Sequence, residues 1–262
     1  YLYTIANVLH GKTLQKLKKK IEKEHDSNIQ VIFAKEAKVL KEKWKGRIVN
    51  IESFKKISLP LVITYLLEKM QADSQSLLLQ EIYFCVKKAS EENKQILYYF
   101  LEKVKTENIV TPDLKSFQRL EEKCKQEKGI WITVSNNRRK SLSRAKWIIN
   151  LDFTKEEIES FQINRQAIII NCKEEKVIYK KGFEGIIIQS FEIENIKNKK
   201  LEENFTSLVI KASEFTFSTN YEENVRNMEK EQVIIRNLIG INGIITQNEL
   251  LNYKKFLTNT KM

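Results

Sequence analysis

Glycine and proline are scarce in this chain, with seven glycines and two prolines among 262 residues. Repeat folds and β-propellers need glycines at regular intervals, so the composition argues against both. Tight turns must instead be built mostly from Asn, Asp, Ser and Lys. The only cysteines, Cys85, Cys124 and Cys172, are widely spaced and form no Cys-x-x-Cys pair. Neither a disulfide framework nor a zinc site is indicated, and a reducing, cytoplasmic compartment is predicted.

Histidine and long apolar runs are also nearly missing. His10 and His25 are the only histidines, each lies beside charged or turn residues, and no Ser or Cys nucleophile pattern accompanies them, so neither is predicted to be catalytic. No apolar stretch approaches the ~20 residues that span a bilayer. Residues 1–9 are apolar and 15–20 are basic, as at the end of a membrane anchor with a cytoplasmic flank. An edge strand or short helix explains the same residues, so a membrane tether upstream of Tyr1 stays an alternative.

Charge and apolar residues are plentiful. Hydrophobic residues make up 42% and charged residues 31%, which supports a buried core and argues against disorder. The net charge of +12 suits a nucleic acid or an anionic membrane as partner. However, lysines alternate with glutamates, as in residues 18–24, and this dispersal favours solvated helix faces over a dedicated polyanion site.

Strand-like and helix-like segments alternate through the middle of the chain. The strand-like runs are apolar without interruption, as in strands buried on both faces. We therefore predict an α/β fold, a Rossmann-like mostly parallel sheet with helices on both sides. The predicted strands cover residues 82–86, 108–111, 130–134, 147–151 and 167–171.

Three parts are predicted. Residues 1–78 form a smaller N-terminal α/β unit, with strands at 29–34 and 47–51 and a buried helix at 59–70. Residues 79–194 form the Rossmann-like domain, in which two apolar runs between 176 and 194 suggest a hairpin or a strand pair on the sheet edge. Residues 195–262 form a linker and C-terminal helices that pack back, one of them over 221–238.

One family resemblance rests on the order of segments between residues 109 and 172. Residues 132–139 (ITVSNNRR) are similar to a strand that ends in Val-x-Asn-Arg, and 145–150 and 167–171 are similar to the later strands of the same pattern. This stretch resembles the Rossmann-like cofactor domain of the shikimate dehydrogenase and glutamyl-tRNA reductase type. The resemblance implies a phosphate-binding loop at 111–116, NADP as cofactor and Arg138 at its 2′-phosphate.

The loop that the resemblance implies lacks the residues its chemistry needs. Residues 111–116 contain no glycine to let the backbone approach a pyrophosphate, and Asp113 adds a negative charge there. We therefore predict no cofactor, with NADP as the alternative. Thr111 and Ser116 either cap the following helix or contact an anion.

The segment from Asn136 to Lys146 is the strongest candidate site. It contains five basic residues and no acid, and it is expected at the carboxyl end of a strand, the usual ligand edge of an open α/β sheet. It can hold a nucleic-acid backbone or another anion, or it is a solvated basic loop. The basic residues are Arg138, Arg139, Lys140, Arg144 and Lys146.

Two further candidates have equally plain alternatives. Asp152, at another strand end, is an acid, a base or a ribose contact, or it caps the turn before Thr154. Trp131 and Trp147 start adjacent strands and are core or sheet-edge residues, with stacking on bases as the alternative.

No catalytic motif stands out, so the leading hypothesis is a non-catalytic Rossmann-like protein with a structural, regulatory or partner-binding role. Its dinucleotide loop would be disabled. The alternatives are an NAD(P)-dependent oxidoreductase with a divergent cofactor loop and a nucleic-acid-binding protein that uses the 136–146 loop.

Overall fold

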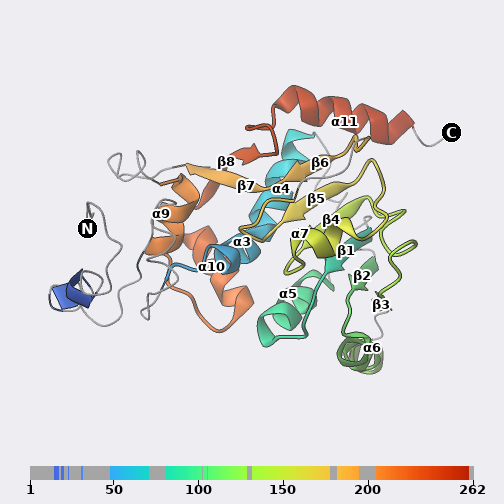
Figure 1. Cartoon of the computed structure of the whole chain (residues 1–262), viewed down its shortest axis with the longest axis horizontal. Helices are drawn as coiled ribbons and strands as arrows, with labels where there is room; N and C mark the ends of the chain where they lie inside the picture. Colours follow the sequence, from blue (N-terminus) through green and yellow to red (C-terminus); the bar gives the residue numbers. More distant parts are fainter. Residues whose placement is uncertain are drawn as a thin grey trace. The chain divides into compact units, whose positions relative to one another are not determined.

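The structure is a computed structural model of the whole chain (Figure 1). It describes residues 15–17, 19–20, 23, 31, 48–70, 81–101, 103–104, 106–128, 132–177, 182–194 and 205–259. Contacts divide the chain into two compact units, residues 52–194 with 217–262 and residues 1–51 with 195–216. The boundaries predicted at 78 and 194 stay predictions of domain organisation. Residues 1–9, His10, His25 and Trp131 lie outside the described residues.

A six-stranded sheet forms the centre of the larger unit, in the order β3-β2-β1-β4-β5-β6 (Figure 1). Every neighbouring pair in it is parallel. This is the strand order of the Rossmann fold, so the predicted fold class is confirmed. The strands are β1 (Glu81–Cys85), β2 (Thr106–Val110), β3 (Ile132–Ser135), β4 (Trp147–Asn150), β5 (Ile168–Asn171) and β6 (Ile186–Ile188).

The central strands are apolar because both of their faces are covered. All four residues of β4 and all four of β5 are buried, and Trp147 pairs with Ile168 at their start. Trp147 is therefore a core residue. The unbroken apolar runs predicted these strands correctly, since a half-exposed strand would alternate apolar and polar residues.

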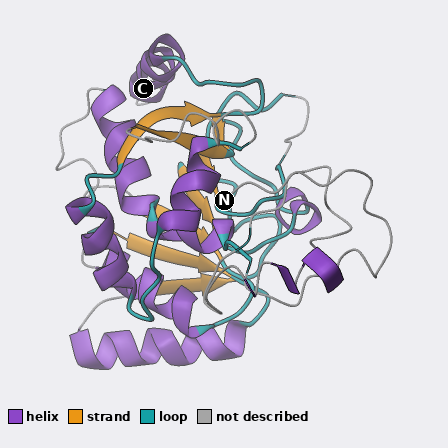
Figure 2. Cartoon of the chain, turned by 90° about the vertical axis from the view of Figure 1, so that its left-hand side faces the viewer, coloured by secondary structure: helices purple, strands orange, loops and turns teal. Residues whose placement is uncertain are grey.

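The two faces of the sheet are covered differently. Helices α5 (Glu91–Leu101) and α6 (Leu114–Lys128) form the β1–β2 and β2–β3 crossovers, and Phe100 of α5 lies 5.5 Å from Phe84 between ring centroids. The opposite face carries the short helix α7 (Lys155–Glu159) and loops, whose buried residues Leu142 and Phe161 join Cys85 in one core cluster. In Figure 2 most helices lie to one side of the strands and much of the loop structure to the other.

Segments that come before and after the six-stranded sheet along the chain complete the larger unit. Tyr65 donates a hydrogen bond to the Arg236 carbonyl at 2.6 Å, and the rings of Tyr99 and Tyr221 meet edge to face at 5.3 Å. The elements involved are α3 (Ile51–Ile57), α4 (Leu59–Lys69), β7 (Ser190–Glu194), α10 (Tyr221–Lys230), β8 (Ile234–Ile239) and α11 (Gln247–Asn259). In the smaller unit, α9 (Ser207–Glu214) begins at its N-cap Thr206.

Three predictions about these segments were wrong. The helix expected over 221–238 ends at Lys230, because the β-branched run from Val233 forms β8, which pairs antiparallel with β7. The two apolar runs between 176 and 194 form no hairpin, since β6 extends the parallel sheet while β7 pairs with β8. Ile51, expected to end a strand, begins α3 instead.

Candidate functional site

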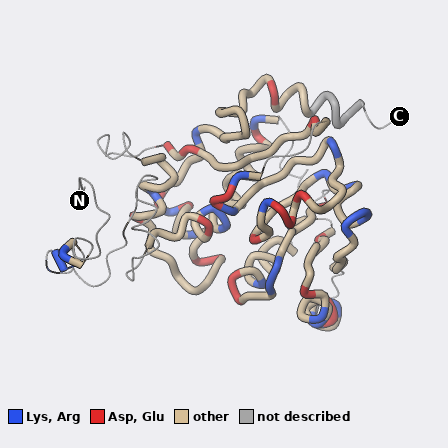
Figure 3. The backbone as a smooth tube through the Cα atoms, in the orientation of Figure 1, with Lys and Arg blue, Asp and Glu red and all other residues tan. Residues whose placement is uncertain are grey.

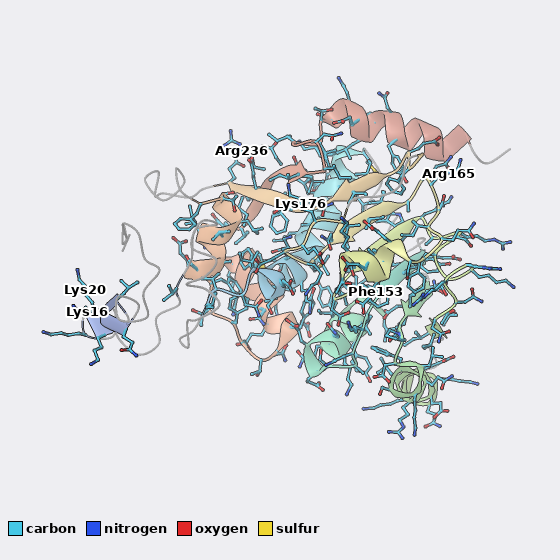
Figure 4. The ribbon with its side chains drawn as sticks, viewed as in Figure 1. Lys16, Lys20, Phe153, Arg165, Lys176 and Arg236 are labelled. Atoms are coloured by element: carbon cyan, nitrogen blue, oxygen red, sulfur yellow. The ribbon has the colours of Figure 1, made fainter. Side chains whose placement is uncertain are left out.

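The carboxyl ends of β1 and β4 mark the place where ligands bind in folds of this type. The two strands are neighbours, and the connections that follow them leave toward opposite faces, the arrangement at which folds of this type form their ligand crevice. Two loops border this crevice, residues 86–90 after β1 and 151–154 after β4. Phe153, labelled in Figure 4, marks the second of them.

The phosphate-binding loop implied by the resemblance is misplaced by one strand. The strand predicted over 108–111 was taken as the family's first strand, but it belongs to β2, while the first strand at the crevice is β1. Residues 111–116 therefore follow the wrong strand for that role. The Thr111 hydroxyl accepts a hydrogen bond from Asp113 N at 3.0 Å, and the Asp113 carboxylate accepts one from Ser116 N at 3.4 Å. These contacts place Thr111 and Ser116 in the cap of α6.

The loop that does follow β1 is bonded to Asp152. This carboxylate accepts a short hydrogen bond from the backbone N–H of Lys87 and another from Asn93 Nδ2 at 2.9 Å. The Lys87 ammonium lies 2.5 Å from a carboxylate oxygen of Glu157 on α7. The backbone N–H and the ammonium of Lys87 are thus both held by acids that follow β4 in the chain, Asp152 and Glu157.

Helix α3 adds a buried lysine to the same place. Lys56 Nζ lies 2.7 Å from Glu92 Oε2 and donates to Asn93 Oδ1 at 3.2 Å. Lys56 and Asn93 are both buried. Asn93 therefore links the ammonium of Lys56 to the carboxylate of Asp152, and we refer to Lys56, Glu92, Asn93 and Asp152 as the crevice cluster.

Lys55, the residue before Lys56 on α3, bonds to the ends of the neighbouring strands. Its buried ammonium donates to the carbonyls of Lys173 at 2.8 Å and Gln189 at 2.7 Å, just beyond β5 and β6. Beneath it, amide side chains join the strand ends, since Asn150 donates to Asn171 at 2.9 Å and Asn171 to Gln189 at 3.0 Å. The carboxyl edge of the sheet is a connected polar network made by the chain itself.

Burial shifts the ionisation of both charged ends of this network. It raises the pKa of Asp152, and the hydrogen bonds from Lys87 and Asn93 and the charge of Lys56 oppose that rise. Burial lowers the pKa of Lys55, against the attraction of Cys172, Glu174 and Glu52. Shifts of this kind occur at catalytic sites and in structural networks alike.

The basic segment between β3 and β4 lies differently from the prediction. It leaves the carboxyl end of β3 at Asn136 and enters β4 directly after Lys146, at the amino edge, because the two strands run parallel and the loop alone makes the crossover. Only its beginning lies at the expected edge of the sheet. Arg138, Arg139, Lys140, Arg144 and Lys146 are all exposed, and Figure 3 shows this loop with blue segments and no red one among them.

Comparison with known proteins includes a distant structural likeness. No protein-family model matches the chain, and no curated protein matches it. Among solved structures, the chain is similar to L-tryptophan dehydrogenase from Nostoc punctiforme, at 10% identity and a TM-score of 0.33, over 96% of this chain and 73% of that one. A likeness this slight carries no argument, and the fold assignment rests on the strand order.

The residues that close the crevice were largely missed from the sequence. Asp152 was noted as an acid, a base, a ribose contact or a cap of the turn before Thr154, but its bonds to Lys87 and Asn93 were not predicted. Lys55 and Lys56 carried no signal among 46 basic residues, because their partners lie 36 to 134 positions away. Within the described ranges no acid, cysteine and histidine group could hold a metal ion, and no helix is long and apolar enough to cross a bilayer.

Proposed function

We propose that this chain is a non-catalytic Rossmann-like scaffold that takes no dinucleotide and works by binding a partner. The observation that carries the proposal is the hydrogen bond from Lys87 N to Asp152. In dinucleotide-binding folds, the backbone N–H groups after the first strand and the helix that follows receive the pyrophosphate. Here a carboxylate of the chain itself takes that N–H.

Two further features support the proposal. Residues 86–93 contain no glycine, so side chains stand where a backbone would need to approach phosphates closely. Two carboxylates lie at the N-terminal end of α5, Glu92 in its first turn and Asp152 bonded to Asn93 of that turn. A pyrophosphate bound there would meet the repulsion of both. The residues present do not fit the phosphates of an NADP molecule.

Ligand-induced stabilisation tests the proposal, because a ligand that binds only the folded state raises its melting temperature. The chain is heated with NADP, NADPH, NAD or NADH at concentrations that stabilise a known NADP-dependent dehydrogenase run beside it. We expect no change in melting temperature for this chain. A concentration-dependent rise with any of the four would overturn the proposal.

A further inference from the structure

We propose that the β3–β4 loop is a binding surface for the sugar-phosphate backbone of a nucleic acid. The proposal names the partner class of the scaffold function and rests on it. The surface consists of Arg138, Arg139, Lys140, Arg144 and Lys146, with Arg165 beside it.

The cations of the loop are unpaired within the described ranges. Several lysines elsewhere in the larger unit lie against acids, such as Lys87 at Glu157, Lys173 at Glu52 and Lys56 at Glu92. Within the part of the chain that the structure describes, none of the five basic residues of the loop makes an ion pair. Their charge is available to a partner from solution.

The backbone of the loop is held in place by hydrogen bonds and by two buried side chains. Asn137 Oδ1 accepts from the N–H groups of Arg139 and Lys140, both at 3.0 Å, and the Arg138 carbonyl accepts from Gln162 N at 2.7 Å. Leu142 and Ala145 are completely buried and anchor the loop in the core. A fixed backbone that projects cations into solvent reduces the ordering cost of binding.

A neighbouring cation extends the surface. The N–H of Asn164 donates to the Leu142 carbonyl at 3.0 Å, which brings the segment before β5 against the loop. Arg165 follows directly and is exposed, pointing outward at the edge of the molecule in Figure 4. Exposed cations from two adjacent segments suit a ligand with repeated negative charges.

The chemistry of the surface favours nucleic acid over a membrane. Stable attachment to an anionic bilayer by a polybasic patch needs a second, apolar anchor. The large apolar residues exposed in the described part of the chain, Ile234, Ile241 and Ile244, lie on β8 and the turn after it, and the apolar residues of the loop are buried. A nucleic-acid strand instead presents a phosphate about every 3.4 Å, and guanidinium groups match phosphate oxygens in pairs.

The same residues predict binding without sequence preference. The loop contains no aromatic residue to stack on bases, and arginines that contact phosphates position a protein without reading base sequence. Affinity must then come mainly from counterion release, so it will fall steeply as salt rises.

The test measures fluorescence anisotropy of labelled duplex DNA, duplex RNA and single-stranded RNA against the full chain over a range of salt. The loop variant is Arg138→Ala with Arg139→Ala and Lys140→Ala. The matched control is Lys115→Ala with Arg119→Ala and Lys125→Ala on α6, which removes the same number of positive charges from exposed positions beside Glu121 and Glu122. Melting temperatures confirm that each variant is folded.

We expect the loop variant to bind at least about tenfold more weakly at low salt and to lose about two to three units from the slope of log affinity against log salt. The control should stay within about twofold of the parent chain. The second loop variant, Arg144→Ala with Lys146→Ala, should lose about two units of that slope, and it tests the surface in the case in which the triple variant fails to fold.

Three results would overturn the inference: no nucleic acid bound by the parent chain at low salt, equal loss in the control and the loop variant, or binding to phosphatidylserine vesicles in place of nucleic acid. Failure of the scaffold proposal is read separately, from the melting temperature with dinucleotides. The two failures are therefore distinguishable.

Discussion

Glu107 is a carboxyl group inside the parallel sheet, fully buried in β2. Among the described residues neither of its oxygens has a hydrogen-bond partner, and burial raises its pKa well above the usual range. The folded protein therefore binds a proton here that the unfolded chain releases near pH ~4.3. The contribution of this group to stability is greatest below that pH and is lost as the pH rises toward the raised pKa of the folded state.

Replacing Glu107 by leucine should remove this loss. At pH 7 we expect Glu107→Leu to be more stable than the parent chain by about 1–3 kcal/mol, and the gap should shrink at about pH 3, where the parent carboxyl is protonated in both states. Urea unfolding at both values measures it. Glu81→Leu, at the exposed first position of β1, is the control for adding a leucine to the sheet without removing a buried carboxyl. A gap for Glu107→Leu that does not depend on pH would contradict the buried carboxyl.

Asp152 is the residue on which the closed crevice depends. In Asp152→Asn one oxygen can still accept from Lys87 N, but the new amide group faces the Asn93 amide that donates to it in the parent chain. Two donors would then meet, so we expect a loss of about 1.5–3 kcal/mol in the free energy of unfolding. Asp113→Asn, which keeps a good N-cap for α6, should cost less than about 0.5 kcal/mol. Equal costs would mean that Asp152 does not hold the loop after β1.

Helix α3 joins the ends of β5 and β6 and the first turn of α5 through two adjacent lysines that face different surroundings. Lys55 satisfies two main-chain carbonyls and lies in the interior, whereas Lys56 pairs with Glu92, whose side chain is 41% exposed. Removing Lys55 leaves carbonyls without a donor and without water, while removing Lys56 lets Glu92 turn to solvent.

We expect Lys55→Met to cost about 1–3 kcal/mol and Lys56→Met less than about 1 kcal/mol. Equilibrium unfolding in urea compares the two directly, and methionine keeps the length of the stem in both. If Lys56→Met were the costlier change, the pair with Glu92 and Asn93 would be the main bond between α3 and the sheet.

Elements were predictable from the sequence where a local pattern determines them. β4 and β5 were found because each begins with three consecutive buried apolar residues. The helix α7 begins at a capping box, whose spacing the sequence shows at Thr154 and Glu157 and which the structure contains. β8 was missed because its partner β7 lies about 40 residues earlier, and strand pairing over such a distance leaves no local pattern.

At the scale of the whole molecule, the fold class was predictable and the state of its ligand crevice was not. The missing glycines were noticed, but at residues 111–116, because the run that forms β1 was not recognised as the central strand. Locating the crevice requires the strand order, and its occupation by Asp152 and Lys56 depends on contacts across 36 to 65 positions. The basic loop was found because its charges are adjacent in sequence, although it crosses the sheet instead of gathering at one edge.

The larger unit is made of two separate stretches of chain, so it can form only after its last stretch is present. Residues 217–262 supply Tyr221, whose hydroxyl donates to the Lys56 carbonyl at 2.9 Å, and β8, the partner of β7. A chain that ends at Thr216 leaves β7 with an open edge and uncovers α4 and α5, which contact β8 and α10. We expect this chain to lose its cooperative thermal transition and to be digested rapidly by protease, while a chain that ends at Asn259 keeps both properties. Adding a peptide of residues 217–262 should restore protection, and a cooperative transition in the shortened chain alone would show that the sheet folds without its C-terminal stretch.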